Sequence, residues 1–384
     1  MNNVLILAQK LGLRQPVIIQ APMAGGITTP ELVAAVSNSG GLGSFATGYL
    51  TPEAARLGIK KIKQLTDKPF AVNLLITDPD AEHSPPLTHF EPYLQMLNKF
   101  EAELKLPPTQ SVLAMPKDYT NDIVDIVLQE NVPIISFAFG VLPEHLIKKL
   151  KEAGVYLIGT ATSLEEAKVL ENVGIDAIVA QGVEAGGHRG GFKTPTRHAA
   201  VGLMALLPRI ADSVKCPVIA AGGIMNGRGI AAAVVLGAAG VQMGTSFIAT
   251  KESGANSIYK KELRKLSLIN YDNTTITSAY SGKPARGVNT QFIRDMEENI
   301  TVYPPYPMAN SLSSAVRKKA AEQNSAQFMS LWSGQGGPLI RGDLMAGELM
   351  MQFRAELAMC LSHLQEIENK SAPGEKNAKL KSKL

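Results

Sequence analysis

Cysteine is scarce in this chain, and long apolar runs are missing. The 384 residues include two cysteines, Cys216 and Cys360, too few for a disulfide framework or for a metal site with four cysteine ligands. Neither the start of the sequence nor any later part has the apolar run of a signal peptide or a membrane span. We therefore expect a cytoplasmic protein with reduced thiols and without a membrane partner.

Neither sign of charge dominates the sequence. The 38 Lys and Arg residues exceed the 34 Asp and Glu residues by four, and much of this excess lies in residues 368–384. A polar, Lys-rich end is typical of a solvated tail rather than of a nucleic-acid contact. We predict a flexible tail there and no nucleic-acid partner.

Apolar runs alternate with amphipathic helical patterns along most of the chain. The runs are continuously apolar, as in parallel strands that are covered on both faces. Several of the helical patterns begin with a capping residue and end at glycine, and an eighth pattern covers 347–364. The alternation predicts an α/β fold, a (β/α)8 TIM barrel rather than an open doubly wound sheet. The runs are residues 17–23, 41–48, 70–76, 132–140, 155–162, 177–183, 218–224 and 241–248.

Three intervals between the expected strands are longer than a barrel repeat needs. They are a Pro-rich excursion at 77–120, a Gly-rich loop at 184–202, and residues 249–345 after the eighth strand. We predict that 249–345 form a smaller, mainly helical second domain, which acts as a lid over the barrel mouth. The barrel itself would comprise residues 1–248 and 346–367.

Glycines follow the seventh and eighth expected strands, where barrels commonly bind phosphate. Gly222, Gly223 and Gly244 would let backbone N–H groups approach an anion, and Thr245 would add a hydroxyl. Glycines of tight turns without a ligand are the alternative. Because both expected loops carry the pattern, we favour a phosphate site.

A phosphate at this corner suggests a phosphorylated cofactor such as FMN. Ala21, Pro22 and Met23 could form an apolar platform under the ring system. Asn73 and Gln181, at the tips of the third and sixth strands, could bond its polar edge because amides both donate and accept. Each amide alone could equally cap a turn, but the two together favour a ligand.

The stretch EAGGHRGG, residues 184–191, surrounds one histidine with small residues. His188 could act as a base or, when protonated, as a partner for an anion; a solvated loop histidine is the alternative. We attribute the lack of side chains to a cofactor and substrate that press against the backbone. For Arg189 we favour a loop anchor over a substrate clamp. No metal site is expected nearby, and Cys216 precedes the seventh strand, on the face opposite to the site, where we interpret it as structural.

These motifs together resemble class I nitronate monooxygenases, formerly called 2-nitropropane dioxygenases. The resemblance spans about residues 5–360 and includes QAPMAGG, AQGVEAGGHRGG, VQMGTSF and LWSGQGG. It implies an FMN-dependent TIM barrel in which His188 is catalytic and Tyr303, Tyr306 and Gln335 lie on the substrate side. The FMN contacts that it implies are Pro22, Met23, Ala24, Asn73, Gln181, Gly186, Gly223, Gln242, Met243, Gly244 and Thr245.

The resemblance also implies a reaction. An alkyl nitronate such as propionate 3-nitronate would react with O2 to give a carbonyl product and nitrite, a detoxification that needs neither metal nor nicotinamide. A homodimer is one possible assembly. Two alternatives stay open: an FMN-dependent NAD(P)H reductase, similar to enoyl-acyl-carrier-protein or quinone reductases, and a flavin-binding protein without turnover. We find no G-x-G-x-x-G motif after a strand, although nicotinamide can bind without it.

Overall fold

Eight parallel strands form a closed barrel. The computed structural model describes residues 2–76, 85–109, 117–193 and 200–371. Hydrogen bonds from Gln20 to Leu42 (3.0 Å) and from Leu42 to Ile18 (2.9 Å) close the ring between its first two strands. The predicted TIM barrel is therefore confirmed. Its strands are β1 (Val17–Gln20), β2 (Gly43–Ala46), β3 (Phe70–Leu75), β4 (Ile134–Ala138), β5 (Tyr156–Ala161), β6 (Ala177–Gln181), β8 (Val218–Ala221) and β9 (Gly240–Met243), each beside the next.

Each of the eight apolar runs corresponds to a strand, and each strand is shorter than its run. We expected a strand over 241–248, whereas β9 ends at Met243 and Thr245–Ile248 form the short helix α10. Because all four residues of α10 are buried, the sequence stays free of charged residues beyond the end of the strand. Apolarity alone could not separate the two elements.

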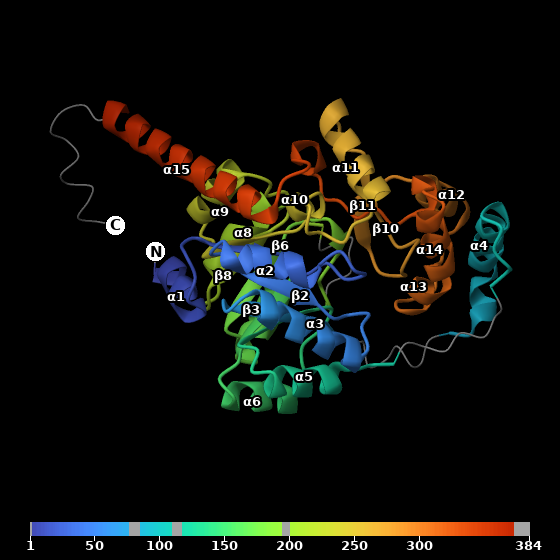
Figure 1. The fold of residues 1–384 in the computed structure, drawn as a ribbon, viewed down its shortest axis with the longest axis horizontal. Helices are drawn as coiled ribbons and strands as arrows, with labels where there is room; N and C mark the ends of the chain where they lie inside the picture. The colour runs from blue at the N-terminus through green and yellow to red at the C-terminus, as the bar shows by residue number, and fades with distance from the viewer. Residues whose placement is uncertain (1, 77–84, 110–116, 194–199, 372–384) are drawn as a thin grey trace.

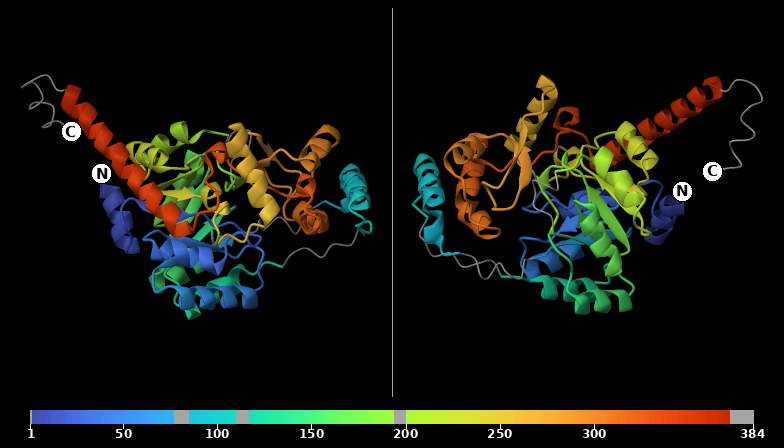
Figure 2. Two further views of the ribbon diagram at one scale, coloured as in Figure 1. Left: turned by 45° about the horizontal axis from the view of Figure 1, so that its top comes forward. Right: turned by 180° about the vertical axis from the view of Figure 1, so that it is seen from behind.

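Helices surround the barrel (Figures 1 and 2). The long helix α15 (Ala346–Ser371) packs against both α9 and α2 and so completes the ring, as the eighth helical pattern predicted. At the amino ends of the strands, Leu7 and Leu11 of α1 (Asn2–Leu11) pack against the interior residues of the barrel. The other barrel helices are α2 (Pro30–Asn38), α3 (Pro52–Leu65), α5 (Thr120–Gln129), α6 (Glu144–Glu152), α7 (Leu164–Asn172), α8 (Leu203–Ala211) and α9 (Gly227–Val235). Within the part of the chain that the structure describes, no helix is both long and apolar enough to cross a bilayer.

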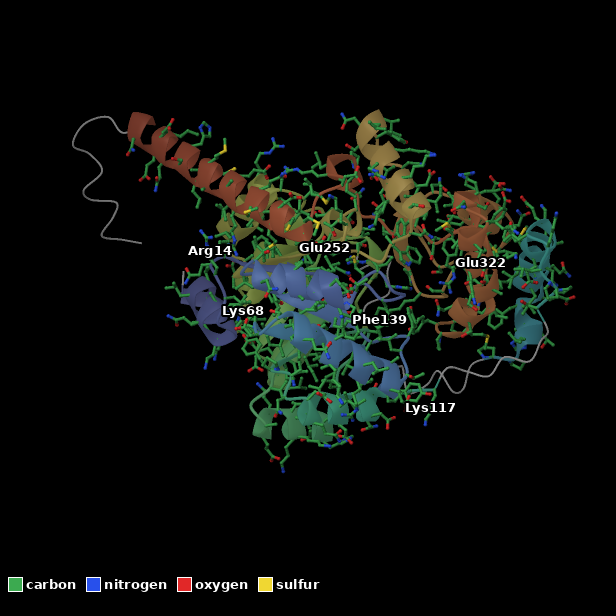
Figure 3. All side chains as sticks on the ribbon, viewed as in Figure 1. Arg14, Lys68, Lys117, Phe139, Glu252 and Glu322 are labelled. Atoms are coloured by element: carbon green, nitrogen blue, oxygen red, sulfur yellow. The ribbon has the colours of Figure 1, made fainter. Side chains whose placement is uncertain are left out.

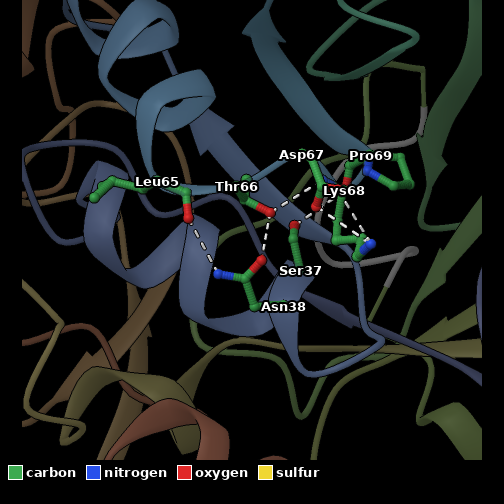
Figure 4. A network of polar contacts seen from close by, with 7 residues as sticks. All are labelled: Ser37, Asn38, Leu65, Thr66, Asp67, Lys68 and Pro69. Atoms are coloured by element: carbon green, nitrogen blue, oxygen red, sulfur yellow. Dashed lines mark hydrogen bonds and ion pairs between the residues drawn. The ribbon is translucent and has the colours of Figure 1, made fainter.

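A polar network fixes the start of β3 (Figure 4). The Thr66 hydroxyl donates to Asn38 Oδ1 at 2.6 Å, and Asn38 Nδ2 donates to the Leu65 carbonyl at 3.2 Å. Ser37 Oγ donates to the Pro69 carbonyl at 3.0 Å and accepts from Gly43 N at 3.2 Å. These bonds tie the end of α3 to α2 and hold β2 and β3 in register.

A second hydrophobic core lies beside the barrel and defines what we call the second lobe, residues 87–106 and 249–340. The lobe contains α4 (Glu91–Glu103), which comes from the Pro-rich excursion between β3 and β4 and lies beside α12 and α14 in Figure 1. The Phe100 ring of α4 contacts the rings of Phe292 and Phe328, with centroids 4.9 and 5.4 Å away. The remaining helices and strands of the lobe follow β9: α11 (Ser257–Ile269), β10 (Thr274–Thr277), β11 (Ala285–Val288), α12 (Gln291–Asn299), α13 (Met308–Leu312) and α14 (Ser314–Glu322).

A small antiparallel sheet joins the second lobe to the barrel. Its strands are β10, β11 and β7 (Gly187–His188), and β7 belongs to the glycine-rich loop after β6. His188 pairs with Ala285, and Gly187 pairs with Arg286. The loop that carries His188 is therefore held by backbone pairing to the insertion. The tail expected at 368–384 lies outside the described residues from 372 onward.

Candidate active site

A cavity lies at the carboxyl ends of the strands, between the barrel and the second lobe. It encloses about 1070 Å³, part of it open to solvent, and the lobe contributes Tyr259 and Trp332 to its wall. A neighbouring cavity of about 470 Å³ shares part of that wall, including Gln181, Gln242 and Thr245. The predicted residues Pro22, Met23, Ala24, Asn73, Gln181, Gly186, His188, Gln242, Gly244 and Thr245 line the larger cavity, and Gly222, Gly223 and Met243 line the smaller one.

The segment after β1 forms an apolar part of the wall. Met23 N donates to the Thr28 hydroxyl at 2.9 Å, which fixes the turn that brings Ala21 to Ala24 into the cavity. Opposite this turn, a Cβ added to Gly244 would meet only Ala21 Cβ, at 3.5 Å, and Met23 Sδ, at 3.9 Å. These are ordinary van der Waals distances, so protein packing does not require glycine at 244.

The two predicted amides differ in their surroundings. Asn73 is buried, and its Nδ2 donates to the Ser136 hydroxyl at 3.0 Å. Gln181 Nε2 donates to the His188 carbonyl at 3.0 Å, and Gln181 Oε1 accepts from Gly190 N at 2.8 Å. Gln181 thus orders the histidine loop, as in the alternative that the sequence left open, in which the amide caps a turn. Each amide keeps a further donor hydrogen and acceptor lone pair for a ligand in the cavity.

Glycines line the smaller cavity, after β8 and β9. Gly222 and Gly223 have φ values of +117° and +70°, which other residues rarely adopt. Thr245 Oγ1 accepts from Gly334 N at 3.0 Å, which brings the segment WSGQGG against this corner, where Gly334 and Gly336 join the wall. The first amide of α9 is taken by the Glu356 carboxylate, since Gly227 N donates to it at 2.9 Å. The corner is therefore built from loops rather than from the start of α9.

Protein neighbours account for most of the small residues around His188. A Cβ at Gly186 would overlap the backbone of Ser333 and Gly334, although Gly186 also lines both cavities. A Cβ at Gly190 would lie 2.6 Å from Thr160 Cγ2, and one at Gly191 would overlap the Thr162 hydroxyl. Our expectation that a cofactor and substrate explain the bare loop is thus corrected, because barrel and lobe pack tightly onto it.

Buried charges hold the two ends of the same loop. Arg189 donates to the carbonyls of Gly182 at 2.6 Å and Gln181 at 3.0 Å, which fits the loop anchor that we favoured. Glu166 accepts from the backbone N–H groups of Phe192 at 2.8 Å and Lys193 at 2.9 Å. Burial raises the pKa of Glu166, but these hydrogen bonds outweigh burial and lower its pKa below the usual value.

His188 lies among aromatic rings at the wall of the larger cavity. Ring centroids of Phe139 and Trp332 are 5.5 and 5.4 Å from that of the imidazole, and His188 Nε2 lies 2.8 Å from Ser281 Oγ. Burial, together with the smaller effects of the nearby charges of Lys283 and Arg317, lowers the pKa of His188 to about 3. This environment keeps the imidazole neutral, so of the two roles that the sequence left open it disfavours the protonated anion partner.

Two cations lie behind the aromatic wall, and the sequence did not single them out. Lys283 Nζ lies 4.7 Å from the centroid of the Phe139 ring, which lines the cavity and is labelled in Figure 3. Arg317 donates to the Asn310 carbonyl at 2.6 Å and to the Ser313 hydroxyl at 3.1 Å, and it forms no ion pair with a carboxylate of the described residues. Both cations give this end of the cavity a positive potential.

None of the three residues expected on the substrate side lines either cavity. The Tyr306 ring lies 5.4 Å from Phe139 and 6.1 Å from His188, measured between centroids. Tyr303 packs edge-on against Tyr93, at 6.1 Å, in the second lobe. Gln335 has an exposed side chain, and its backbone N donates to the Glu184 carbonyl at 3.0 Å. Only Tyr306 lies beside His188.

The structure gives no ligand set for a metal. In residues 2–76, 85–109, 117–193 and 200–371, no three His, Cys, Asp or Glu side chains lie close enough together to hold an ion. Cys216 precedes β8 and so lies at the opposite end of the barrel from the cavity. Burial raises the pKa of its thiol to about 12, so it is not a thiolate nucleophile.

The structure is a TIM-barrel protein with a cavity between the barrel and an inserted lobe. The model of the family described as nitronate monooxygenase matches residues 8–356. The chain belongs to the nitronate monooxygenase family of oxidoreductases.

Individual relatives support this membership. A Bacillus subtilis protein named probable nitronate monooxygenase is 41% identical over 91% of this chain and 97% of its own length. Among solved structures, a nitroalkane oxidase from Streptomyces ansochromogenes has a TM-score of 0.83 and 38% identity, covering 94% of this chain and 99% of that one. FabK from Thermotoga maritima has a TM-score of 0.72 and 30% identity, over 94% and 98% of the two chains.

Proposed function

We propose that this protein is an FMN-dependent nitronate monooxygenase that uses O2 to convert an alkyl nitronate into a carbonyl product and nitrite. The position of His188 is the observation that carries the proposal. Its imidazole lines a cavity that continues into a glycine-lined corner, and Lys283 and Arg317 lie close enough to influence its ionisation. The family membership and the likeness to a nitroalkane oxidase agree with this reading.

The residues of the two cavities fit FMN. The smaller cavity, with Gly222, Gly223 and Thr245, would hold the phosphate through backbone N–H groups and a hydroxyl. Ala21 to Ala24 would lie against the ring system, and Asn73 and Gln181 would bond its polar edge. Bound FMN supplies the electron transfer from the nitronate toward O2. Gly186, Gln242, Met243 and Gly244 complete the proposed FMN site.

The second lobe would give the site its substrate side. We propose that residues 1–248 and 346–367 form the FMN-binding barrel and that 249–345 cover it. Residues 87–106 lie within the first of these ranges but pack in the core of the second lobe. Lys283 and Arg317 would attract an anionic nitronate, while Trp332, Phe139 and Tyr306 around His188 exclude water. With a neutral nitroalkane, His188 would remove the α-proton.

One experiment tests the proposal against the reductase alternative. The purified protein is examined for bound FMN and mixed aerobically with propionate 3-nitronate, while O2 and nitrite are followed. We expect O2 consumption and nitrite without added nicotinamide. If NADH or NADPH bleaches the flavin anaerobically and no nitronate is consumed, the protein is a reductase and the proposal fails.

A matched variant separates catalysis from cofactor binding. Because the neutral His188 imidazole would be the base, His188→Asn should retain FMN and lose most turnover of a neutral nitroalkane, about 100-fold or more. An unchanged rate would show that His188 is a structural loop residue. A variant without FMN would point to a role in holding the cofactor.

A further inference from the structure

Ser281 connects the second lobe to the imidazole of His188. It lies in the turn between β10 and β11 and is 1% exposed. The same hairpin pairs with His188 through β11, because Ala285 lies opposite the histidine in the small sheet. Arg189 N also donates to the Pro284 carbonyl at 2.8 Å. Backbone and side-chain contacts from one hairpin thus fix the position of His188.

All three contacts of the Ser281 hydroxyl can be hydrogen bonds at once in only one arrangement of protons. Ser281 Oγ lies 3.0 Å from the Lys283 carbonyl, which can only accept, so in this arrangement the hydroxyl proton points to that carbonyl. Lys283 N donates to Ser281 Oγ at 3.3 Å and occupies one of its lone pairs. The remaining lone pair faces His188 Nε2 at 2.8 Å, and this contact is a hydrogen bond only if Nε2 carries a hydrogen.

We propose that Ser281 is a positioning residue that holds neutral His188 in its Nε2-protonated tautomer and leaves Nδ1 as the ring nitrogen that accepts a proton. Nδ1 forms no hydrogen bond within the described residues, so its lone pair is not used by the protein there. The lowered pKa of His188 agrees with this assignment. It keeps the ring neutral, and a neutral imidazole has one nitrogen that carries a hydrogen and one whose lone pair can accept a proton. The tautomer of His188 does not depend on the proposed function. Only the effect of the tautomer on catalysis rests on that function.

Nitrogen-15 NMR of the full-length, histidine-labelled protein measures the tautomer directly. The His188 signals are assigned by their loss in His188→Asn. We expect a protonated Nε2 and an unprotonated Nδ1 at pH 7. A protonated Nδ1 in the wild-type protein would overturn the proposal, whatever the behaviour of any variant.

Two variants test whether Ser281 causes this preference. Ser281→Ala removes the acceptor, so we expect both tautomers to be populated, whereas Ser281→Thr keeps the hydroxyl and should preserve one. Retention of the wild-type tautomer in Ser281→Ala would refute the role of Ser281. Circular dichroism identifies a variant that fails to fold. In that case the NMR spectrum of the wild-type protein alone tests which nitrogen of His188 is protonated.

Kinetics add a second readout. In Ser281→Ala we expect kcat on a neutral nitroalkane to fall about 10-fold, because part of the population presents the wrong nitrogen. Turnover of the preformed nitronate, which needs no proton removal, should change less than about 2-fold. An equal loss on both substrates would refute a tautomer role. If the wild-type protein turns over neither substrate, the proposed function fails, while the NMR result still tests the tautomer.

Discussion

Gln181 and Gly190 are joined across the histidine loop by a hydrogen bond of 2.8 Å from Gly190 N to Gln181 Oε1. The same side chain donates from Nε2 to the His188 carbonyl at 3.0 Å, so one amide holds the backbone on both sides of Arg189. The Gly190 carbonyl in turn accepts from Phe139 N at 2.9 Å, which links the loop to the end of β4. Gln181, at the end of β6, therefore helps to fix the position of His188.

These two hydrogen bonds of Gln181 predict that its side chain contributes to stability as well as to the proposed FMN site. Gln181→Ala leaves two backbone groups without their partner, so we expect a loss of about 1–3 kcal/mol in the free energy of unfolding. Gln181→Glu keeps an acceptor for Gly190 N but loses the donor to the His188 carbonyl, and it should be intermediate. Urea denaturation of the FMN-free proteins measures both. Equal stability of all three would show that the amide serves only a ligand.

The lowered pKa of His188 predicts an acid limit on stability. Its pKa is about 3 in the folded protein and near 6.5 in an unfolded chain. Between these values the unfolded chain binds the proton and the folded protein does not, so falling pH favours unfolding. We expect His188→Asn to lose less stability than the wild-type protein as pH falls from about 6.5 toward 3, as measured by denaturant titration. Parallel pH curves would contradict this prediction.

The barrel could be predicted from the sequence because continuous apolar runs and capped helices are local signals. All thirteen barrel-side residues assigned to the site line the two cavities, since the carboxyl ends of parallel strands meet on one face. Ser281, Lys283 and Arg317 were missed because their position depends on how the second lobe docks. Phe139 directly follows β4 and could have been found from its place at the carboxyl end of a strand. No local sequence pattern predicts that Lys283 lies over the ring of Phe139, which is distant in the sequence. Nor does one predict that α4 packs in a core formed mostly by residues after β9.

The cation over Phe139 predicts a preference for anionic substrates. Lys283→Met keeps the apolar stem but removes the charge, so we expect KM for a nitronate to rise about 5- to 30-fold, with kcat changed less. KM for a neutral nitroalkane should stay within about 2-fold. Lys265→Met is a suitable control because Lys265 is an exposed residue of α11 paired with Glu262. If both variants change KM alike, the effect comes from net charge and the prediction fails.

Substitutions at Gly244 and Gly186 distinguish an effect on cofactor binding from an effect on protein packing. A Cβ at 244 reaches only ordinary contact distance from Ala21 and Met23, in the wall of the larger cavity, and its φ of −105° suits other residues. Gly244→Ala should therefore change the free energy of unfolding by less than about 1 kcal/mol. It should weaken FMN binding about 10-fold, because the methyl group enters the proposed FMN site.

Gly186→Ala is the contrasting variant, because its Cβ would overlap the backbone of Ser333 and Gly334. Backbone cannot move aside as a flexible side chain does, so we expect a loss of about 1–3 kcal/mol in stability. Chemical denaturation of the FMN-free proteins and fluorescence titration with FMN separate the two effects. A Gly244→Ala protein that binds FMN as tightly as the wild type would place the cofactor elsewhere, even if Gly186→Ala is destabilised as expected.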